Sequence, residues 1–161
     1  MPKMIEIPVY TVGELSEKAR DKAHSEYLSC GFDFDHSDNI STIKSFCDLF
    51  DVTLYAWSVY SCSYSYDATI TKQRNITKRK ALAMVNSWEI NQGYFLASVA
   101  YDAMKSEWQN GDIKQAIKKV LDSMFKAWQH DLEDCESVEY FVESCEANEW
   151  TFLESGELFY V

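Results

Sequence analysis

The stretch Val52-Thr53-Leu54-Tyr55-Ala56-Trp57-Ser58-Val59-Tyr60 decides the fold class, because its residues are mostly β-branched or aromatic. A short polar segment from Ser61 to Ser63 follows. Beyond it, Tyr64, Tyr66, Ala68 and Ile70 alternate with polar residues. A period of two in such residues is typical of strands, so the sequence predicts an antiparallel pair over Val52–Thr71. We expect its tyrosines to pack under helices, and an exposed recognition strip is the alternative.

Apolar residues at helical intervals occur both before and after this pair of strands. Ile40, Ile43, Cys47 and Phe50 precede it at intervals of three and four residues. Apolar residues at similar intervals follow over 81–88, 95–104 and 113–128, and the last run also has a capping box at Asp112 and Gln115. The sequence therefore predicts an α+β fold, with a small antiparallel sheet covered by four to six helices in a single domain over residues 1–161.

The two ends of the chain carry their own signals. Residues 5–10 resemble a short strand, and Thr11 with Glu14 forms a capping box that predicts a helix start, with Gly31 at its end. At the other end, residues 149–161 are predicted to form a hairpin in which Gly156 supplies a positive φ. The 161-residue length suits one compact unit with a core of its own.

The charge is unevenly distributed. The chain has 15 Lys and Arg against 26 Asp and Glu, a net charge of −11. From Asp131 to Val161 there are ten acidic residues and no Lys or Arg, so residues 1–130 carry a net charge of only −1. A negative protein repels nucleic acid and anionic membranes. We therefore expect a basic partner protein, no direct binding to nucleic acid, and no membrane association.

The segment from Leu132 to Ala147 is predicted to be an amphipathic helix. At 100° per residue, Cys135, Val138, Phe141, Val142 and Cys145 share one arc. The opposite arc holds five carboxylates, which are the candidate partner-binding residues: Glu133, Glu136, Glu139, Glu143 and Glu146. Such a stripe imitates a run of phosphates, so a basic nucleic-acid-binding groove is a fitting target. The alternative is a solvated face that only aids solubility.

Candidate active-site residues are sparse. Asp33, Asp35, His36 and Asp38 have side chains that ligate metals, but a helix cap by Ser37 or Asp38 is the simpler interpretation. No nucleophile elbow, phosphate-binding loop, dinucleotide fingerprint or HExxH motif occurs. We therefore expect no catalytic residues, no metal and no cofactor.

The cysteines and the lack of a recognisable targeting signal bear on where the protein acts, and a basic segment offers a second candidate contact surface. The five cysteines lack CxxC spacing, and no signal peptide or membrane-spanning run is expected, which together favour a cytosolic protein with reduced, buried thiols. The segment Lys72–Lys80 has five basic residues and no acid; it is either a phosphate or acidic-partner contact or a solvated loop and helix start.

Both ends of the chain resemble one family. Tyr10-Thr11-Val12-Gly13-Glu14-Leu15-Ser16 resembles the start, and Ala147-Asn148-Glu149-Trp150-Thr151-Phe152-Leu153-Glu154-Ser155-Gly156 the end, of small, largely uncharacterised accessory proteins of tailed phages and prophages. The resemblance implies a phage protein that acts in the host cytoplasm.

Three functional hypotheses follow from the sequence. The leading one is a non-enzymatic anti-defence protein that inhibits a host CRISPR effector, restriction enzyme or nuclease through its acidic C-terminal face. The second is an antitoxin-like or regulatory binding protein that uses Lys72–Lys80. The third is a small metal-dependent hydrolase that uses Asp33, Asp35 and His36. The sequence leaves open whether the protein is a monomer or a homodimer.

Overall fold

The computed structural model describes residues 6–29, 35–71, 76–108 and 112–159. Its elements in chain order are η1 (Val12–Glu14), α1 (Glu17–Ser29), α2 (Ser37–Leu49), β1 (Val52–Tyr60), β2 (Ser63–Ile70), α3 (Lys78–Gln92), α4 (Phe95–Glu107), α5 (Ile113–Cys135) and α6 (Val138–Ala147). Within these ranges, six α-helices and a two-stranded antiparallel sheet confirm the predicted α+β class. The chain divides into two compact units, residues 35–133 and residues 1–34 with 134–161. The single domain over 1–161 stays a prediction.

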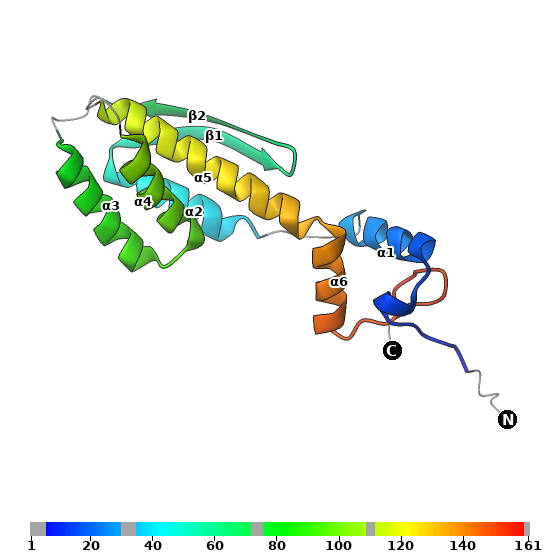
Figure 1. Cartoon of the computed structure of the whole chain (residues 1–161). Coiled ribbons are helices and arrows are strands. Elements are labelled where there is room, and N and C mark those ends of the chain that lie inside the picture. Colours follow the sequence, from blue (N-terminus) through cyan, green and yellow to red (C-terminus); the bar gives the residue numbers. More distant parts are fainter. Residues whose placement is uncertain (1–5, 30–34, 72–75, 109–111, 160–161) are drawn as a thin grey trace. The chain divides into compact units, whose positions relative to one another are not determined.

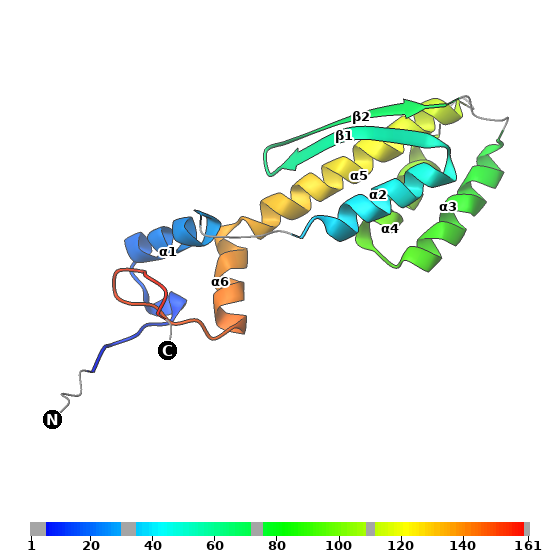
Figure 2. The ribbon, with the colours of Figure 1, turned by 180° about the vertical axis from the view of Figure 1, so that it is seen from behind.

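The unit of residues 35–133 is built around the hairpin β1–β2, which α2 and α5 accompany along its length (Figures 1 and 2). The predicted pairing over Val52–Thr71 is confirmed, from Val52 opposite Ile70 to Tyr60 opposite Ser63. The register shifts between Leu54 and Ala56, so Tyr55 is an extra residue in β1. Opposite residues in antiparallel strands share a face, so Val59 with Tyr64 and Trp57 with Tyr66 lie on one side of the hairpin.

That side packs on α5, as the alternation in β2 predicts. The rings of Tyr64 and Tyr66 stack on Phe125, with centroids 6.1 and 4.7 Å apart. Gln129 Nε2 donates to the carbonyl of Ser61 at 3.2 Å, which ties the hairpin turn to the same helix. α2 contacts β1, α3 and α4, and α3 packs against α4 (Figure 1). The helix periods at 40–50, 81–88, 95–104 and 113–128 all correspond to observed helices.

The other unit contains α1, α6 and the segments near both termini. Its buried core consists of Val12, Leu15, Ala19, Ala23, Phe141, Cys145 and Phe152. The predicted strand at residues 5–10 is reduced to one bridge, in which Tyr10 and Phe152 exchange two backbone hydrogen bonds of 2.8 Å. The predicted terminal hairpin is present as a turn with a bridge between Phe152 and Leu158, and Gly156 has φ +87°.

The first helix begins later than the sequence predicts. The capping box is present, because the Glu14 carboxylate accepts from both the amide and the hydroxyl of Thr11 at 2.8 and 3.0 Å. It closes the short 3-10 turn η1, however, and Leu15 then has extended backbone angles. Ser16 Oγ accepts from the amide of Ala19 at 3.3 Å, so α1 has a second cap of its own. The predicted end at Gly31 lies outside the described residues.

Candidate functional site

The predicted acidic helix over 132–147 is wrong as a single element. α5 continues to Cys135, and α6 starts afresh at Val138. Ser137 separates them: its hydroxyl donates to the carbonyl of Asp134 at 2.6 Å and accepts from the amide of Tyr140 at 3.1 Å. A serine side chain that can satisfy the free amides of a new helix favours this break. Periodicity alone missed it because apolar residues keep helical spacing through the turn.

The break distributes the five predicted carboxylates over three environments. Glu133 lies on α5, where His130 Nδ1 is 3.3 Å from its Oε2, and it belongs to the unit of residues 35–133. Glu136 lies in the connection and is half-buried. Glu139, Glu143 and Glu146 are exposed on α6. The structure therefore brings together the last three as predicted, and their role in binding stays a prediction.

α6 is held by its apolar side. Phe141 and Cys145 are each 1% exposed in the core formed with α1 and η1. The ring of Tyr27 lies 5.2 Å from that of Phe141, centroid to centroid. With these residues fixed inward, Glu139, Tyr140 and Glu143 face solvent. We call Glu139, Tyr140, Glu143 and Glu146 the α6 acidic face.

The carboxylates of this face are not neutralised locally. In the described part of the chain, no Lys, Arg or His forms an ion pair with Glu139, Glu143 or Glu146. Side chains three and four residues apart on a helix lie roughly 5–6 Å from each other, so the charges repel. Tyr140 stands among them with 41% of its surface exposed. An exposed aromatic between charges is typical of side chains that anchor protein interfaces.

His24 holds the connection before α6. It lies on α1 and is half-buried. Its Nε2 is 2.9 Å from the backbone oxygen of Glu136, and its ring lies 5.3 Å from that of Phe141. This contact joins residues 112 positions apart, so no local pattern indicates it. His24 therefore positions the start of α6 from α1.

The charge is as unevenly distributed between the two units as it is along the sequence. The unit of residues 1–34 and 134–161 contains fourteen Asp and Glu against four Lys and Arg, a net charge of −10. The unit of residues 35–133 has a net charge of −1. α1 itself holds three acidic and three basic residues, so the excess comes mainly from residues 134–161, which carry a net charge of −8. Lys22, one of the four cations in the unit that contains α1, already contacts Glu26 and Glu157.

The candidate metal-binding residues have structural roles where they are described. The carboxylate of Asp35 accepts from the amide of Ser37 at 2.9 Å. Hydrogen bonds from the hydroxyl and from the amide of Ser37 hold the pKa of Asp35 below its usual range. Nδ1 of His36 accepts from the indole of Trp128 at 3.1 Å. Asp33 lies outside the described residues. In the described ranges no three His, Cys, Asp or Glu side chains are arranged to hold a metal ion.

The basic segment Lys72–Lys80 is described only in its second half. Residues 72–75 of Lys72–Lys80 lie outside the described part of the chain. Lys78, Arg79 and Lys80 form the exposed first turn of α3. Lys78 Nζ donates to the Trp108 carbonyl at 3.1 Å.

Cys47 and Cys145 are buried free thiols, as expected, and burial raises the pKa of each to about 11. Cys135 is half-buried and Cys62 is exposed in the hairpin turn, contrary to the expected burial.

Two further observations concern membrane-spanning helices and similarity to known proteins. Among the helices that the structure describes, none is long and apolar enough to cross a membrane. No protein-family model, curated protein or solved structure matches the sequence.

Proposed function

We propose that the protein is a non-enzymatic phage accessory protein that binds and inhibits a nucleic-acid-binding defence protein of the host, such as a CRISPR effector, a restriction enzyme or a nuclease. The observation that carries the proposal is the segregation of charge, with −10 of the net −11 in the unit that contains α6. The setting in a phage-infected host rests on the resemblance of the two chain ends to phage accessory proteins.

The α6 acidic face is the proposed contact surface. Glu139, Glu143 and Glu146 span about 10 Å along the helix axis at 1.5 Å per residue. A groove that normally holds a nucleic-acid backbone presents Lys and Arg to successive phosphates, and carboxylates in a row satisfy the same cations. Tyr140, next to Glu139 on the same exposed part of the helix, adds an aromatic anchor beside the row. Host cytoplasm is the proposed site of action.

The test compares two variants with the same change in net charge. The first replaces Glu139, Glu143 and Glu146 by Gln. The matched control replaces Asp48, Asp51 and Asp102 by Asn, three exposed carboxylates of the other unit. Each protein is added to purified CRISPR effectors, restriction enzymes and nucleases, and both binding and DNA cleavage are measured. We expect the wild type and the control to inhibit one of these enzymes, and the α6 variant to lose most of this inhibition.

Salt dependence provides a second readout. Because the Debye length shortens to about 8 Å at physiological ionic strength, exposed charges are increasingly screened as salt rises. Affinity of the wild type for its target should therefore fall with added salt, mainly through the association rate. The α6 variant should show a flatter salt curve. Equal inhibition by both variants with the same salt curve would contradict the role of the α6 acidic face.

A further inference from the structure

β2 has an open edge that lacks the usual protection. The sheet contains two strands, so in the described residues no strand pairs with the outer edge of β2. Its eight residues include no Lys, Arg, Pro or Gly, and its only charged side chain is Asp67. The irregularity of the hairpin lies in β1, where Tyr55 is the extra residue. Proteins blunt free edges with lysines, prolines or bulges. The edge of β2 is therefore regular and ready to pair.

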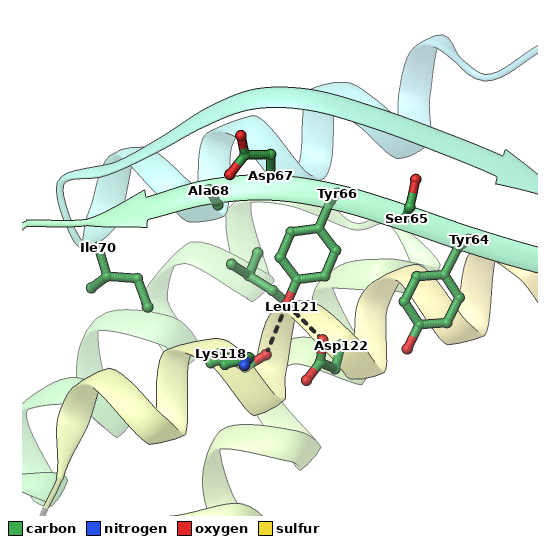
Figure 3. Close-up of a pocket in the computed structure, with 9 residues that line it drawn as sticks. All are labelled: Tyr64, Ser65, Tyr66, Asp67, Ala68, Ile70, Lys118, Leu121 and Asp122. Atoms are coloured by element: carbon green, nitrogen blue, oxygen red, sulfur yellow. Dashed lines mark hydrogen bonds between the residues drawn. The ribbon is translucent and has the colours of Figure 1, made fainter.

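A groove of about 440 Å³ runs between this edge and α5 (Figure 3). Tyr64 and Tyr66 point from β2 toward the helix, and Ser65 and Asp67 point away from it. The phenol of Tyr66 donates to Asp122 at 2.6 Å and approaches the backbone oxygen of Lys118 at 3.5 Å. The groove thus combines an open strand edge, an apolar floor and one charge of each sign on α5.

We propose that the protein forms a symmetric homodimer in which the open β2 edges of two copies pair antiparallel, centred on Tyr66. Two-fold symmetry makes an edge-to-edge pair of identical strands antiparallel and closes the assembly at two copies. Opposite residues in such a pair share a face. The helix side of both hairpins therefore stays on the same side of a continuous four-stranded sheet.

Side-chain size selects this register. Centred on Tyr66, the pairing sets Tyr64 opposite Ala68 of the second copy, so a large ring fills the space that a small side chain leaves. Asp67 then lies opposite Ser65 of the second copy, and the two Asp67 carboxylates avoid each other. A register centred on Ser65 instead opposes Tyr64 with Tyr66 at two places, whereas the register centred on Tyr66 opposes two large rings once, where Tyr66 meets its own copy at the axis.

Charge selects the same register. Because the Tyr66 hydroxyl contacts the backbone oxygen of Lys118 and the carboxylate of Asp122, a two-fold axis centred on Tyr66 would pass between these two positions of α5. A two-fold axis there brings Lys118 of each copy toward Asp122 of the other. In the described residues the Lys118 ammonium has no ion-pair partner within its own chain. The dimer would give it one, and opposite charges across an interface also exclude wrong registers.

Sedimentation equilibrium and light scattering of the full chain test the proposal. The wild type should have twice the chain mass of 18.7 kDa. Lys118→Asp and Asp122→Lys each create two like-charge contacts across the axis and should raise the dissociation constant by roughly ten- to a hundredfold. An equal mixture of these two variants restores opposite charges at both contacts and should be dimeric. Tyr66→Phe removes the hydrogen bond to Asp122 without changing charge and should remain dimeric.

Directed cross-linking tests the register without altering α5. In a Cys62→Ser background, a chain with Ser65→Cys is mixed with a chain with Asp67→Cys, because these positions are opposite only between copies. A disulfide between the two chains is expected in the mixture, and much less within either variant alone. This measurement holds even where a charge variant fails to fold. All the residues involved lie in the unit of residues 35–133, so the result is independent of the α6 acidic face.

Several outcomes would overturn the proposal. Weak complexes have dissociation constants of about 1 mM. A wild type that is monomeric at about 100 μM would therefore refute a stable homodimer. The open edge would then be available to an extended segment of another protein. Single charge variants that stay as dimeric as the wild type would place the interface elsewhere. A mixture that remains monomeric, or cross-linking no greater than in the separate variants, would refute the register.

Discussion

Lys22 Nζ on α1 lies 3.1 Å from Oε1 of Glu157 in the terminal turn, although 135 residues separate them in the sequence. The bond raises the pKa of Lys22, because the carboxylate favours the charged ammonium. Both side chains are largely exposed, so the pair adds little to the free energy of unfolding. The same turn also places Gly156 against the backbone of Ala19.

Gly156→Ala should destabilise the protein strongly. Gly156 has φ +87°, which an L side chain rarely adopts, and an added Cβ would collide with the carbonyl of Ala19. Because the obstacle is backbone, it cannot rotate away. We expect the free energy of unfolding to fall by at least about 2 kcal/mol, measured by urea denaturation.

Two other glycines serve as controls that separate the cost of the positive φ from the cost of the collision. Gly93 also has positive φ, +66°, but an added Cβ meets nothing within 4 Å, so Gly93→Ala should cost only the backbone strain, about 1 kcal/mol. Gly13 has open space as well and no positive φ, so Gly13→Ala should be close to neutral. A Gly156→Ala variant no less stable than Gly93→Ala would contradict the collision.

Tyr66 should make stability sensitive to alkaline pH. Burial, followed by the hydrogen bond to Asp122, raises the pKa of Tyr66 above its usual value of 10.0. Its stabilising contribution is therefore complete below pH 10 and is lost as the pH rises above 10, because the unfolded chain releases the phenolic proton first. Tyr66→Phe should show a shallower decline of the free energy of unfolding above pH 10, whereas Tyr55→Phe, on the exposed face, should follow the wild type.

Cys62 should react first among the four cysteines that the structure describes. It is exposed in the hairpin turn, whereas Cys47 and Cys145 are buried and have pKa values raised to about 11. Because the thiolate is the reacting form, both burial and a raised pKa slow alkylation. Mass spectrometry after brief treatment with iodoacetamide should find the label at Cys62 and not at the two buried thiols. Labelling of Cys47 or Cys145 at the same rate would show that their surroundings open readily.

The pairing of Trp128 with His36 should matter for stability. Trp128 is fully buried, and its indole donates to Nδ1 of His36. Trp128→Phe leaves a cavity and removes the donor, so the free energy of unfolding should fall by about 2–3 kcal/mol. Trp57→Phe, at a ring that is 38% exposed, should cost less than about 1 kcal/mol. Equal costs would indicate that the buried indole and its bond to His36 contribute little to stability.

Much of the local structure follows from the sequence alone. The change of period at Val52 identified the hairpin, and the apolar spacing from Ile113 to Trp128 identified α5, because a strand and a helix repeat their buried side at different intervals. The positive φ of Gly156 also followed from its place in a predicted turn. These features depend only on residues that are close together in the sequence.

The candidate site depended on the tertiary structure. Sequence periodicity could not show that Ser137 ends one helix and caps the next, since an apolar stripe is compatible with both. Nor could it place Ser16, rather than Thr11, at the start of α1, because both residues are good caps. The contacts of His24 with Glu136 and of Lys22 with Glu157 join segments more than a hundred residues apart. Long-range packing, rather than local preference, decides which carboxylates share a surface, because only the folded core determines which side of each helix faces water.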